Sequence, residues 1–235
     1  MRIMHLTGVF PRPTETFIKR YVEKSCLFAE VDLASFHFED IDPAMPGVSF
    51  FALNREFYTR KNITGAARYL SERISRERSW YNGFDQAIRE FQPDIIHCHF
   101  GTEGISMMQF EKKIKTKVPY VTSFYGYDIS SLPATDKRYR ENLIRLLNHG
   151  NAFFAEGPEL KKKVLAFGCA DEKCLVNPLL IPEEDYPRKE TYRKPGDPVK
   201  FLFVGRFIEK KGFHIFLEAI GRTLKKPGSF TIDVI

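Results

Sequence analysis

The sequence predicts an α/β fold, in which a parallel β-sheet carries helices on both faces. Short apolar runs typical of buried strands recur along the chain, and amphipathic stretches of about ten to fifteen residues separate them. Hydrophobic residues make up 43% of the 235 positions, which is enough for a packed core and excludes a disordered chain. Strands that alternate with helices in this way join through right-handed crossovers into a parallel sheet.

The apolar runs set the expected strands, and glycines end several of them. The first run stops at Gly8 and the fourth at Gly101. In chain order, the expected strands are residues 2–7, 31–36, 48–53, 94–100, 120–124, 152–155, 173–176, 201–204 and 230–235.

Helices are expected between these strands, and their ends carry recognisable signals. Thr14 is placed to cap the first helix, with Glu15 in its first turn, where an acidic side chain complements the helix dipole. Pro158 opens a later helix, which ends at Gly168. In chain order, the expected helices run from 14 toward 28, then over 54–91, 101–115, 136–148 and 158–167, with a last one opened by Lys211.

Residues 178–198 interrupt the alternation of strands and helices. Five prolines stand among charged residues here, and this composition is typical of a linker with some stiffness. The sequence therefore predicts a first domain over residues 1–177, a linker over 178–198 and the beginning of a second α/β unit over 199–235.

The net charge of +6 fits an ordinary basic protein and also fits attraction to phosphorylated substrates, acidic lipid surfaces or nucleic acid. Nucleic acid is not expected as a partner, because the sequence has no helix-turn-helix signal, no aromatic RNA-binding motif and no cysteine–histidine finger. The expected helix over 54–91 is rich in arginine, which predicts either a solvated face or a surface that rests on anionic lipid.

The chain has no apolar segment of signal-peptide length and none that approaches a membrane span. We therefore expect a cytoplasmic protein, and the basic helix adds a peripheral contact with the inner face of an anionic membrane as a further possibility.

The four cysteines form no Cys-x-x-Cys pair and are expected to be reduced thiols, mostly buried. They are Cys26, Cys98, Cys169 and Cys174. Cys98 lies between His97 and His99, and on a strand these two histidines share the face opposite to Cys98. Two histidines without a third nearby ligand make a poor zinc site, so no bound metal is expected.

One edge of the predicted sheet gathers candidate site residues. Ligands of parallel sheets bind beyond the carboxyl ends of the strands, and this rule brings Gly8, residues 97–101 and residues 125–128 to one edge. Arg206 lies at the corresponding end of the strand in the second unit, and Lys211 opens the helix that follows. A strand end, two cations and a helix N-terminus make a site for a diphosphate. The alternative is that Arg206 is a surface cation and Lys211 a solubilising residue at a helix end.

Four motifs occur in order along the chain. They are Phe-Pro-Arg-Pro-Thr-Glu-Thr-Phe-Ile at 10–18, Pro-Asp-Ile-Ile-His-Cys-His-Phe at 93–100, Pro-Tyr-Val-Thr-Ser-Phe-Tyr-Gly-Tyr-Asp at 119–128, and Val-Gly-Arg with Lys-Lys-Gly at 204–212. Together they resemble the family 4 retaining glycosyltransferases of the two-domain GT-B fold, and in particular their exopolysaccharide, or colanic-acid-type, branch.

The resemblance implies a Rossmann-like acceptor-side domain followed by the start of a Rossmann-like donor domain. It implies transfer of a sugar from a nucleotide-sugar donor to a glycan or lipid-linked acceptor, with the anomeric configuration retained and with no cofactor or metal. In this picture Arg206 and Lys211, together with Gly8, contact the donor diphosphate.

The other site residues implied by the resemblance come from the first domain. The catalytic candidates are His99, Tyr125 and Asp128, and the acceptor-side candidates are Thr14, Glu15 and Thr16. Three of these have structural alternatives that the sequence leaves open. His99 fits a histidine bonded to backbone in the core, Asp128 fits an Asx-type turn, and Glu15 fits a residue favoured by the helix dipole.

The sequence departs from the family pattern at two points. Tyr125 stands where the family often has histidine, and a tyrosine with a pKa of about 10 donates a hydrogen bond but is no base at neutral pH. The family's Glu-x7-Glu motif, which holds the donor sugar and ribose, would lie beyond Ile235. We therefore expect a truncated enzyme that is inactive alone.

Two other classes of protein remain open at this point. A nucleotide-sugar 2-epimerase shares the architecture, although the Thr-Glu-Thr opening at 14–16 argues against it. A non-catalytic module that binds a carbohydrate or phosphorylated ligand is the second alternative.

Overall fold

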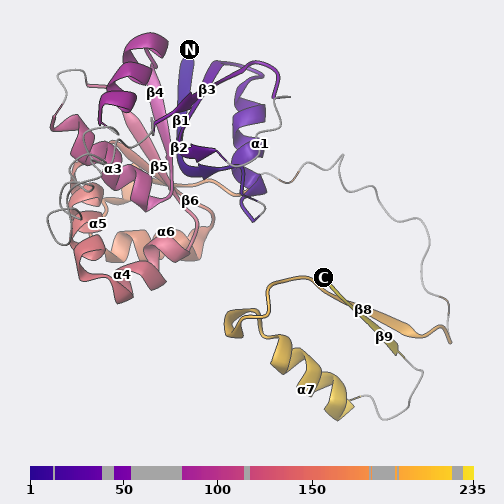
Figure 1. Cartoon of the computed structure of the whole chain (residues 1–235). Helices are drawn as coiled ribbons and strands as arrows, with labels where there is room; N and C mark the ends of the chain where they lie inside the picture. Colours follow the sequence, from indigo (N-terminus) through magenta and orange to yellow (C-terminus); the bar gives the residue numbers. More distant parts are fainter. Residues whose placement is uncertain are drawn as a thin grey trace, which may run out of the picture. The chain divides into compact units, whose positions relative to one another are not determined.

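The computed structural model describes residues 1–12, 14–38, 45–53, 81–113, 117–179, 181, 194, 196–223 and 230–235. The chain divides into two compact units, Met1–Ile181 and Pro182–Ile235, and each is described by itself (Figure 1). The predicted boundaries at 177 and 198 remain predictions, since most of the expected linker lies outside the described residues.

The described part of the first unit forms a seven-stranded sheet in the order β3-β2-β1-β4-β5-β6-β7, and every neighbouring pair is parallel. This confirms the predicted fold class. The strands are β1 Arg2–Phe10, β2 Glu30–Phe38, β3 Val48–Ala52, β4 Ile95–His99, β5 Tyr120–Phe124, β6 Ala152–Ala155 and β7 Cys174–Val176.

The prediction that Gly8 ends the first strand is wrong. Strand β1 continues through Gly8 to Phe10, because Val9 and Phe10 pair with His37 and Phe38 of β2. Strand pairing with β2 on both sides of Gly8 keeps the backbone extended through this glycine.

The helices lie between the strands as predicted, except that a short helix, Ser131–Thr135, precedes the helix expected from residue 136 and was not predicted. They are α1 Thr16–Ser25, α3 Gly101–Glu111, α4 Ser131–Thr135, α5 Lys137–His149 and α6 Pro158–Ala166, with short 3-10 turns η1 Tyr127–Ile129 and η2 Asp171–Lys173. Residues 81–91 are also helical, whereas residues 54–80 of the same predicted helix, with their basic side chains, lie outside the described residues. None of the helices that the structure describes has the length and apolar character needed to cross a bilayer.

The predicted cap of the first helix is also corrected. Glu15, and not Thr14, occupies the N-cap position of α1, and no side-chain hydrogen bond caps this end. Glu15 therefore precedes the first turn in which it was expected. Asp136 supplies a side-chain cap to α5, where its carboxylate accepts a hydrogen bond from the Tyr139 amide at 2.9 Å.

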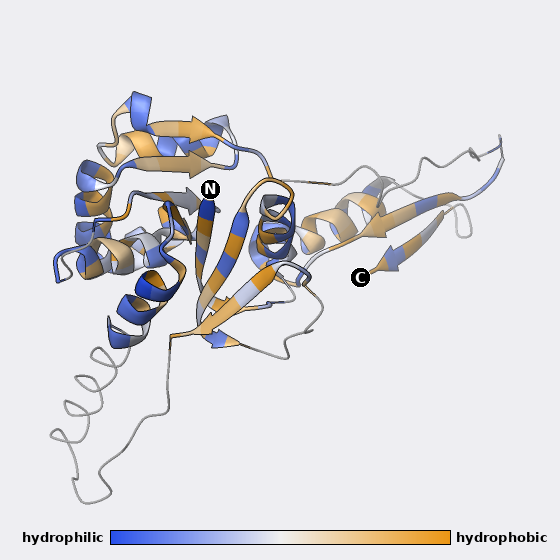
Figure 2. Cartoon of the chain, turned by 90° about the horizontal axis from the view of Figure 1, so that it is seen from above, coloured by the Kyte–Doolittle hydropathy of each residue, from blue (hydrophilic) through white to orange (hydrophobic). Residues whose placement is uncertain are grey.

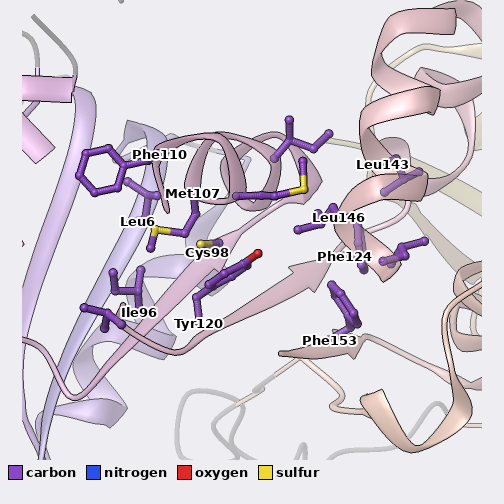
Figure 3. Packing of buried hydrophobic residues seen from close by; sticks show 14 of the residues in the cluster. Leu6, Ile96, Cys98, Met107, Phe110, Tyr120, Phe124, Leu143, Leu146 and Phe153 are labelled. Carbon is purple, nitrogen blue, oxygen red and sulfur yellow. The ribbon is translucent and has the colours of Figure 1, made fainter. Parts of the chain in front are cut away.

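Apolar side chains pack on both faces of the sheet. On one face, α3, α5, α6 and residues 81–91 cover the strands, and Figure 3 shows Cys98 of β4 and Tyr120 of β5 pointing toward Met107 of α3. On the other face, Ile18 and Val22 of α1 pack with residues of β2. All four cysteines are free, and all except half-buried Cys26 are buried, as predicted. Alternate residues of β1, β4 and β5 therefore face α1, and these residues build the candidate site.

The second unit pairs β8 Val199–Phe203 with β9 Phe230–Val234 in parallel. Between them lie the 3-10 turn η4 Glu209–Lys211 and helix α7 Phe213–Thr223. Lys211 therefore ends η4 instead of opening the helix. Phe203 of β8 packs against Phe213 and Phe216 of α7, with ring centroids 4.7 and 5.7 Å apart. Figure 2 shows that β8 and α7 are rich in hydrophobic residues, and one of them, Leu202, is 61% exposed.

Candidate functional site

The candidate site lies where the strand order of the sheet changes direction. Strand β1 has β2 on one side and β4 on the other, so the chain winds outward in both directions from the β1–β4 pair. The carboxyl ends of strands at such a switch point form the usual ligand crevice of a doubly wound sheet. His5 of β1 lies directly opposite His97 of β4 in this pairing. The topology therefore brings distant polar residues together.

Helix α1 covers these polar residues with side chains spaced four residues apart, which lie along one side of a helix. Near its start, the Phe17 ring lies 4.5 Å from the Tyr125 ring. One turn on, Tyr21 contacts the rings of His97 and His99. One turn further, the Ser25 hydroxyl lies 3.1 Å from Nε2 of His5. Residues of α1 therefore contact the whole histidine cluster.

Three buried histidines form a hydrogen-bonded cluster with hydroxyl groups at its margin. Nδ1 of His5 lies 2.9 Å from Nε2 of His99. Nδ1 of His99 lies 2.8 Å from the Tyr125 hydroxyl, and Nε2 of His97 lies 2.7 Å from the Ser123 hydroxyl. His99 is fully buried here, so the structure places it in a polar network rather than against solvent.

Burial keeps these histidines neutral. Desolvation lowers the pKa of His97 to about 4, because the charged imidazolium is disfavoured away from water. Desolvation also lowers the pKa of His5 and of His99 well below the ordinary value, and charge on the neighbouring histidines lowers both further. The cluster is therefore uncharged at neutral pH.

From the sequence, His97 and His99 were considered as possible metal ligands, and the structure adds His5. One ring nitrogen from each of His5, His97 and His99 lies within 4.8 Å of the others. The premise that no third ligand is near is therefore wrong. His5 was missed because only the pairing of β1 with β4 brings it close.

Two of the three histidines are hydrogen-bonded to each other in this structure. Nδ1 of His5 and Nε2 of His99 are hydrogen-bonded to each other, so a metal ion would have to displace that hydrogen bond. The rings of His97 and His99 stack, with centroids 4.2 Å apart and 30° between their planes. Zinc needs ligand lone pairs that converge on one point. Metal independence remains a prediction.

Asp128 holds the backbone at the carboxyl edge. Its two carboxylate oxygens accept hydrogen bonds from the amides of Gly101 at 2.9 Å and Tyr125 at 3.1 Å. The Tyr139 hydroxyl donates to the Asp128 carbonyl at 2.7 Å. Burial raises the pKa of the Asp128 carboxyl to about 6, although the backbone hydrogen bonds act in the opposite direction. These contacts run to a preceding residue and to α3, and not two residues on as in the Asx-type turn considered from the sequence, and they tie the loop after β5 to the start of α3.

Glu103 is a buried acid that the sequence analysis did not select. It lies in the first turn of α3, is 7% exposed and accepts a hydrogen bond from the Thr102 hydroxyl. Its pKa is raised to about 8, first by desolvation and in smaller part by the nearby carboxylates of Asp128 and Glu15. Glu103 is therefore largely protonated at neutral pH. An acid in the first turn of the helix that follows a site strand is the signal that could have identified it.

Gly8 makes room for this acid. A β-carbon at position 8 would lie 2.9 Å from Oε1 of Glu103, closer than such atoms come in proteins. The structure thus gives Gly8 a packing role beside Glu103, in addition to the diphosphate contact that the family resemblance implies. Gly8 also brings the acid to the edge on which His99 and Asp128 lie.

The acceptor-side candidates lie around the start of α1. Glu15 is half-buried, and its carboxylate accepts a hydrogen bond from the Arg12 guanidinium at 3.3 Å. Burial raises the pKa of Glu15, although the charge of Arg12 lowers it. Thr14 and Thr16 are exposed on either side of it. Tyr125, which contacts Phe17 in the first turn of α1, is partly exposed, and burial raises the pKa of its phenol.

The diphosphate candidates belong to the second unit. Arg206 and Lys211 are both exposed, close to the end of β8. The aliphatic stem of Lys211 lies over Gly205, since its Cγ is 3.7 Å from where a β-carbon at that glycine would be. Gly212 has a left-handed φ of 70°, which turns the chain from η4 into α7. The loop therefore places Lys211 against the residue that precedes Arg206.

A doubly wound parallel sheet with polar residues at its switch point, followed by a second strand–helix–strand unit, is the arrangement of a protein of the GT-B fold class. The chain belongs to Glycosyltransferase Family 4, whose family model matches residues 41–184, more than half of the sequence.

Two curated relatives support this placement. The amylovoran biosynthesis glycosyltransferase AmsK of Erwinia amylovora is 29% identical over 147 residues, which are 63% of this chain and 36% of AmsK. WcaL of Salmonella typhimurium, a glycosyltransferase whose name refers to colanic acid biosynthesis, is 27% identical over 143 residues, covering 61% of this chain and 34% of WcaL. The chain thus spans about a third of the length of the curated relatives it matches.

A solved structure shows the same fold at low identity. Anabaena Alr3699/HepE in complex with UDP-glucose superposes with a TM-score of 0.64 at 15% identity, over 100% of this chain and 60% of HepE. At this identity the likeness concerns the fold alone.

Proposed function

We propose that the protein transfers a sugar, with retention of configuration, from a nucleotide-sugar donor to a glycan or lipid-linked acceptor during synthesis of cell-surface polysaccharide. The observation that carries the proposal is the hydrogen bond between His99 and Tyr125 at the carboxyl ends of β4 and β5, with Phe17 of the first turn of α1 against the Tyr125 ring. The names of AmsK and WcaL support the polysaccharide pathway, and the UDP-glucose in HepE supports the class of donor.

The donor diphosphate is assigned to the second unit. A nucleoside diphosphate gains negative charge as it leaves the sugar, and cations aimed at it stabilise the transition state. Arg206 and Lys211 are exposed cations beside a strand end and the start of α7, where anions bind readily. With these two side chains in place, the reaction does not require a metal ion.

The acceptor is assigned to the edge of the first unit. Carboxyl, imidazole and phenol groups there match the hydroxyl groups of a sugar, which donate and accept hydrogen bonds. Most of this edge is buried and neutral, so it suits an uncharged glycan better than a phosphate. Contact with the inner face of an anionic membrane also belongs to the proposal, because a lipid-linked acceptor would be presented there.

A thermal-shift screen of nucleotide-sugars tests the donor assignment. A donor at one hundred times its Kd should raise the free energy of unfolding by about 2.7 kcal/mol. Arg206→Gln and Lys211→Gln should remove this stabilisation. Lys210→Gln is the matched control, since Lys210 is an exposed cation in the same 3-10 turn. A donor that stabilises all four proteins equally would contradict the assignment.

Turnover provides the second readout. We expect no enzyme-like rate from these 235 residues alone, and we expect a product of retained configuration from a protein that also carries the Glu-x7-Glu motif of the family. Conversion of the donor to its 2-epimer would instead identify an epimerase, and binding without turnover in that longer protein would identify a binding module.

A further inference from the structure

The hydrogen bonds between Ser25 and Tyr125 form one continuous chain whose proton positions can be deduced. The chain runs from Ser25 to His5, from His5 to His99, and from His99 to Tyr125. Ser25, His5 and His99 are buried, whereas Tyr125 is partly exposed. Tyr125 is therefore the end of the chain that a ligand can reach.

Ser25 sets the direction of every hydrogen bond in this series. Its hydroxyl lies 2.8 Å from the Tyr21 carbonyl, and because a carbonyl only accepts, the single hydroxyl proton of Ser25 is committed there. The Ser25 oxygen must then accept from His5, which places the proton of His5 on Nε2. A neutral imidazole has one N–H, so Nδ1 of His5 is an acceptor.

The same reasoning fixes the remaining members. Nε2 of His99 must donate to Nδ1 of His5, so His99 also carries its proton on Nε2. Nδ1 of His99 is then an acceptor, and the Tyr125 hydroxyl donates to it. Both histidines have to be neutral for this arrangement, and their complete burial favours that form.

We propose that His5 and Ser25 are positioning residues that turn Tyr125 into a hydrogen-bond acceptor for a hydroxyl group of the acceptor sugar. The phenol proton is committed to His99, so the substrate meets the oxygen lone pairs of Tyr125. The Ser123 hydroxyl also hydrogen-bonds this phenol, which leaves one acceptor position on the oxygen. From the sequence, Tyr125 was considered as a hydrogen-bond donor, and in the structure its proton is directed to His99 and not to the substrate.

The chain positions groups and does not carry protons away. Its far end is the Tyr21 carbonyl of α1, which cannot take up a proton. Tyr125 therefore orients the attacking hydroxyl by accepting its hydrogen bond while another group removes the proton. The functional consequence rests on the proposed glycosyltransferase activity, but the proton positions do not.

Two-bond ¹H–¹⁵N correlation spectra of the protein with ¹⁵N-labelled histidine test the inference, because they distinguish protonated from unprotonated ring nitrogens. In the wild-type protein we expect His5 and His99 to be neutral and protonated on Nε2. Finding His99 protonated on Nδ1 would overturn the proposal. This readout needs no substrate, so it can fail while the proposed function stands.

The Ser25→Ala variant tests whether Ser25 sets the proton positions on His5 and His99. Without the serine oxygen, the original direction leaves a buried N–H of His5 unpaired, whereas the reversed direction leaves only a lone pair unpaired. We expect the reversed form, in which His99 is protonated on Nδ1, to predominate about tenfold. Ser25→Thr keeps a hydroxyl and should restore the wild-type form. Cys26→Ala is the matched control, because its thiol bonds backbone carbonyls and no histidine. An unchanged His99 in Ser25→Ala would overturn the proposal.

Discussion

Strands β4 and β8 are each followed by a helix and by candidate site residues, yet their surroundings are opposite. Strand β4 leads directly into α3, whereas β8 leads through the turn η4 into α7. Four of the five residues of β4 are buried, whereas no residue of β8 is. Polar groups beyond β4 are buried and neutral, as in Glu103, while those beyond β8 are exposed cations such as Arg206. One sequence pattern therefore supports two kinds of site.

The difference shows how each site would recognise its ligand. The edge of the first unit is organised by packing, since α1 fixes the histidines and Asp128 fixes the loop after β5. The loop of the second unit relies on charge that is available to solvent. The first site should select by shape and hydrogen bonding, and the second should attract any diphosphate.

Truncating the core should have the largest effect and separates the two units most clearly. Phe124 of β5 is fully buried, and Phe124→Ala should cost about 3–5 kcal/mol of unfolding free energy through lost burial and a cavity. Leu202→Ala in β8 should change it by less than about 0.5 kcal/mol, because that side chain is exposed. Urea unfolding followed by circular dichroism measures both, and equal losses would break the comparison.

Removing one cation should have the next largest effect. Arg206→Gln should raise the barrier to transfer by about 2–4 kcal/mol, by analogy with the loss of a donor aimed at developing negative charge. Single-turnover kinetics in a protein with transferase activity measure this barrier. A loss confined to donor affinity, with the chemical step unchanged, would assign Arg206 to ground-state binding instead.

Acid should destabilise the first unit through its histidines. His97 has a folded pKa of about 4, below its unfolded value near 6.5, so the unfolded state binds the proton first as pH falls. Stability is lost between about pH 6.5 and 4, at about 1.4 kcal/mol per pH unit for this residue alone. His97→Gln should flatten the pH dependence of the urea midpoint in that window. An unchanged slope would show that His97 is charged in the folded protein.

Glu103 should act in the opposite direction. Its folded pKa of about 8 lies above its unfolded value, so the folded state keeps the proton and stability falls as pH rises from about 4.5 to 8. The loss should approach about 1.4 kcal/mol per pH unit within this window, the limit for a single proton. Glu103→Gln mimics the protonated acid, and its advantage over wild type should therefore grow toward pH 8. An advantage that is constant with pH would mean that Glu103 is ionised throughout.

The sequence predicted the elements well because their signals are local. Apolar runs located the strands to within a few residues, and β5 and β6 start and end where expected. Two of the errors concern relations between distant residues. Gly8 lies inside β1 because β2 supplies a ladder, and the third histidine appears only through the β1–β4 register.

The site was predicted only in part, for the same reason. His99, Tyr125 and Asp128 stand in recognisable motifs, so the sequence could nominate them, and their roles remain predictions. Glu103 and Ser25 have no motif. Their contributions depend on burial and on hydrogen bonds to residues of other elements.

Titrating UDP into the ¹⁵N-labelled chain tests the proposed diphosphate site most directly. The account predicts that the amide signals of Gly205, Arg206 and Gly212 move, that the signals of β4 and β5 stay in place, and that Arg206→Gln abolishes the movement. Movement confined to the first unit, or no movement above about 1 mM UDP, the weak end of specific binding, would contradict it.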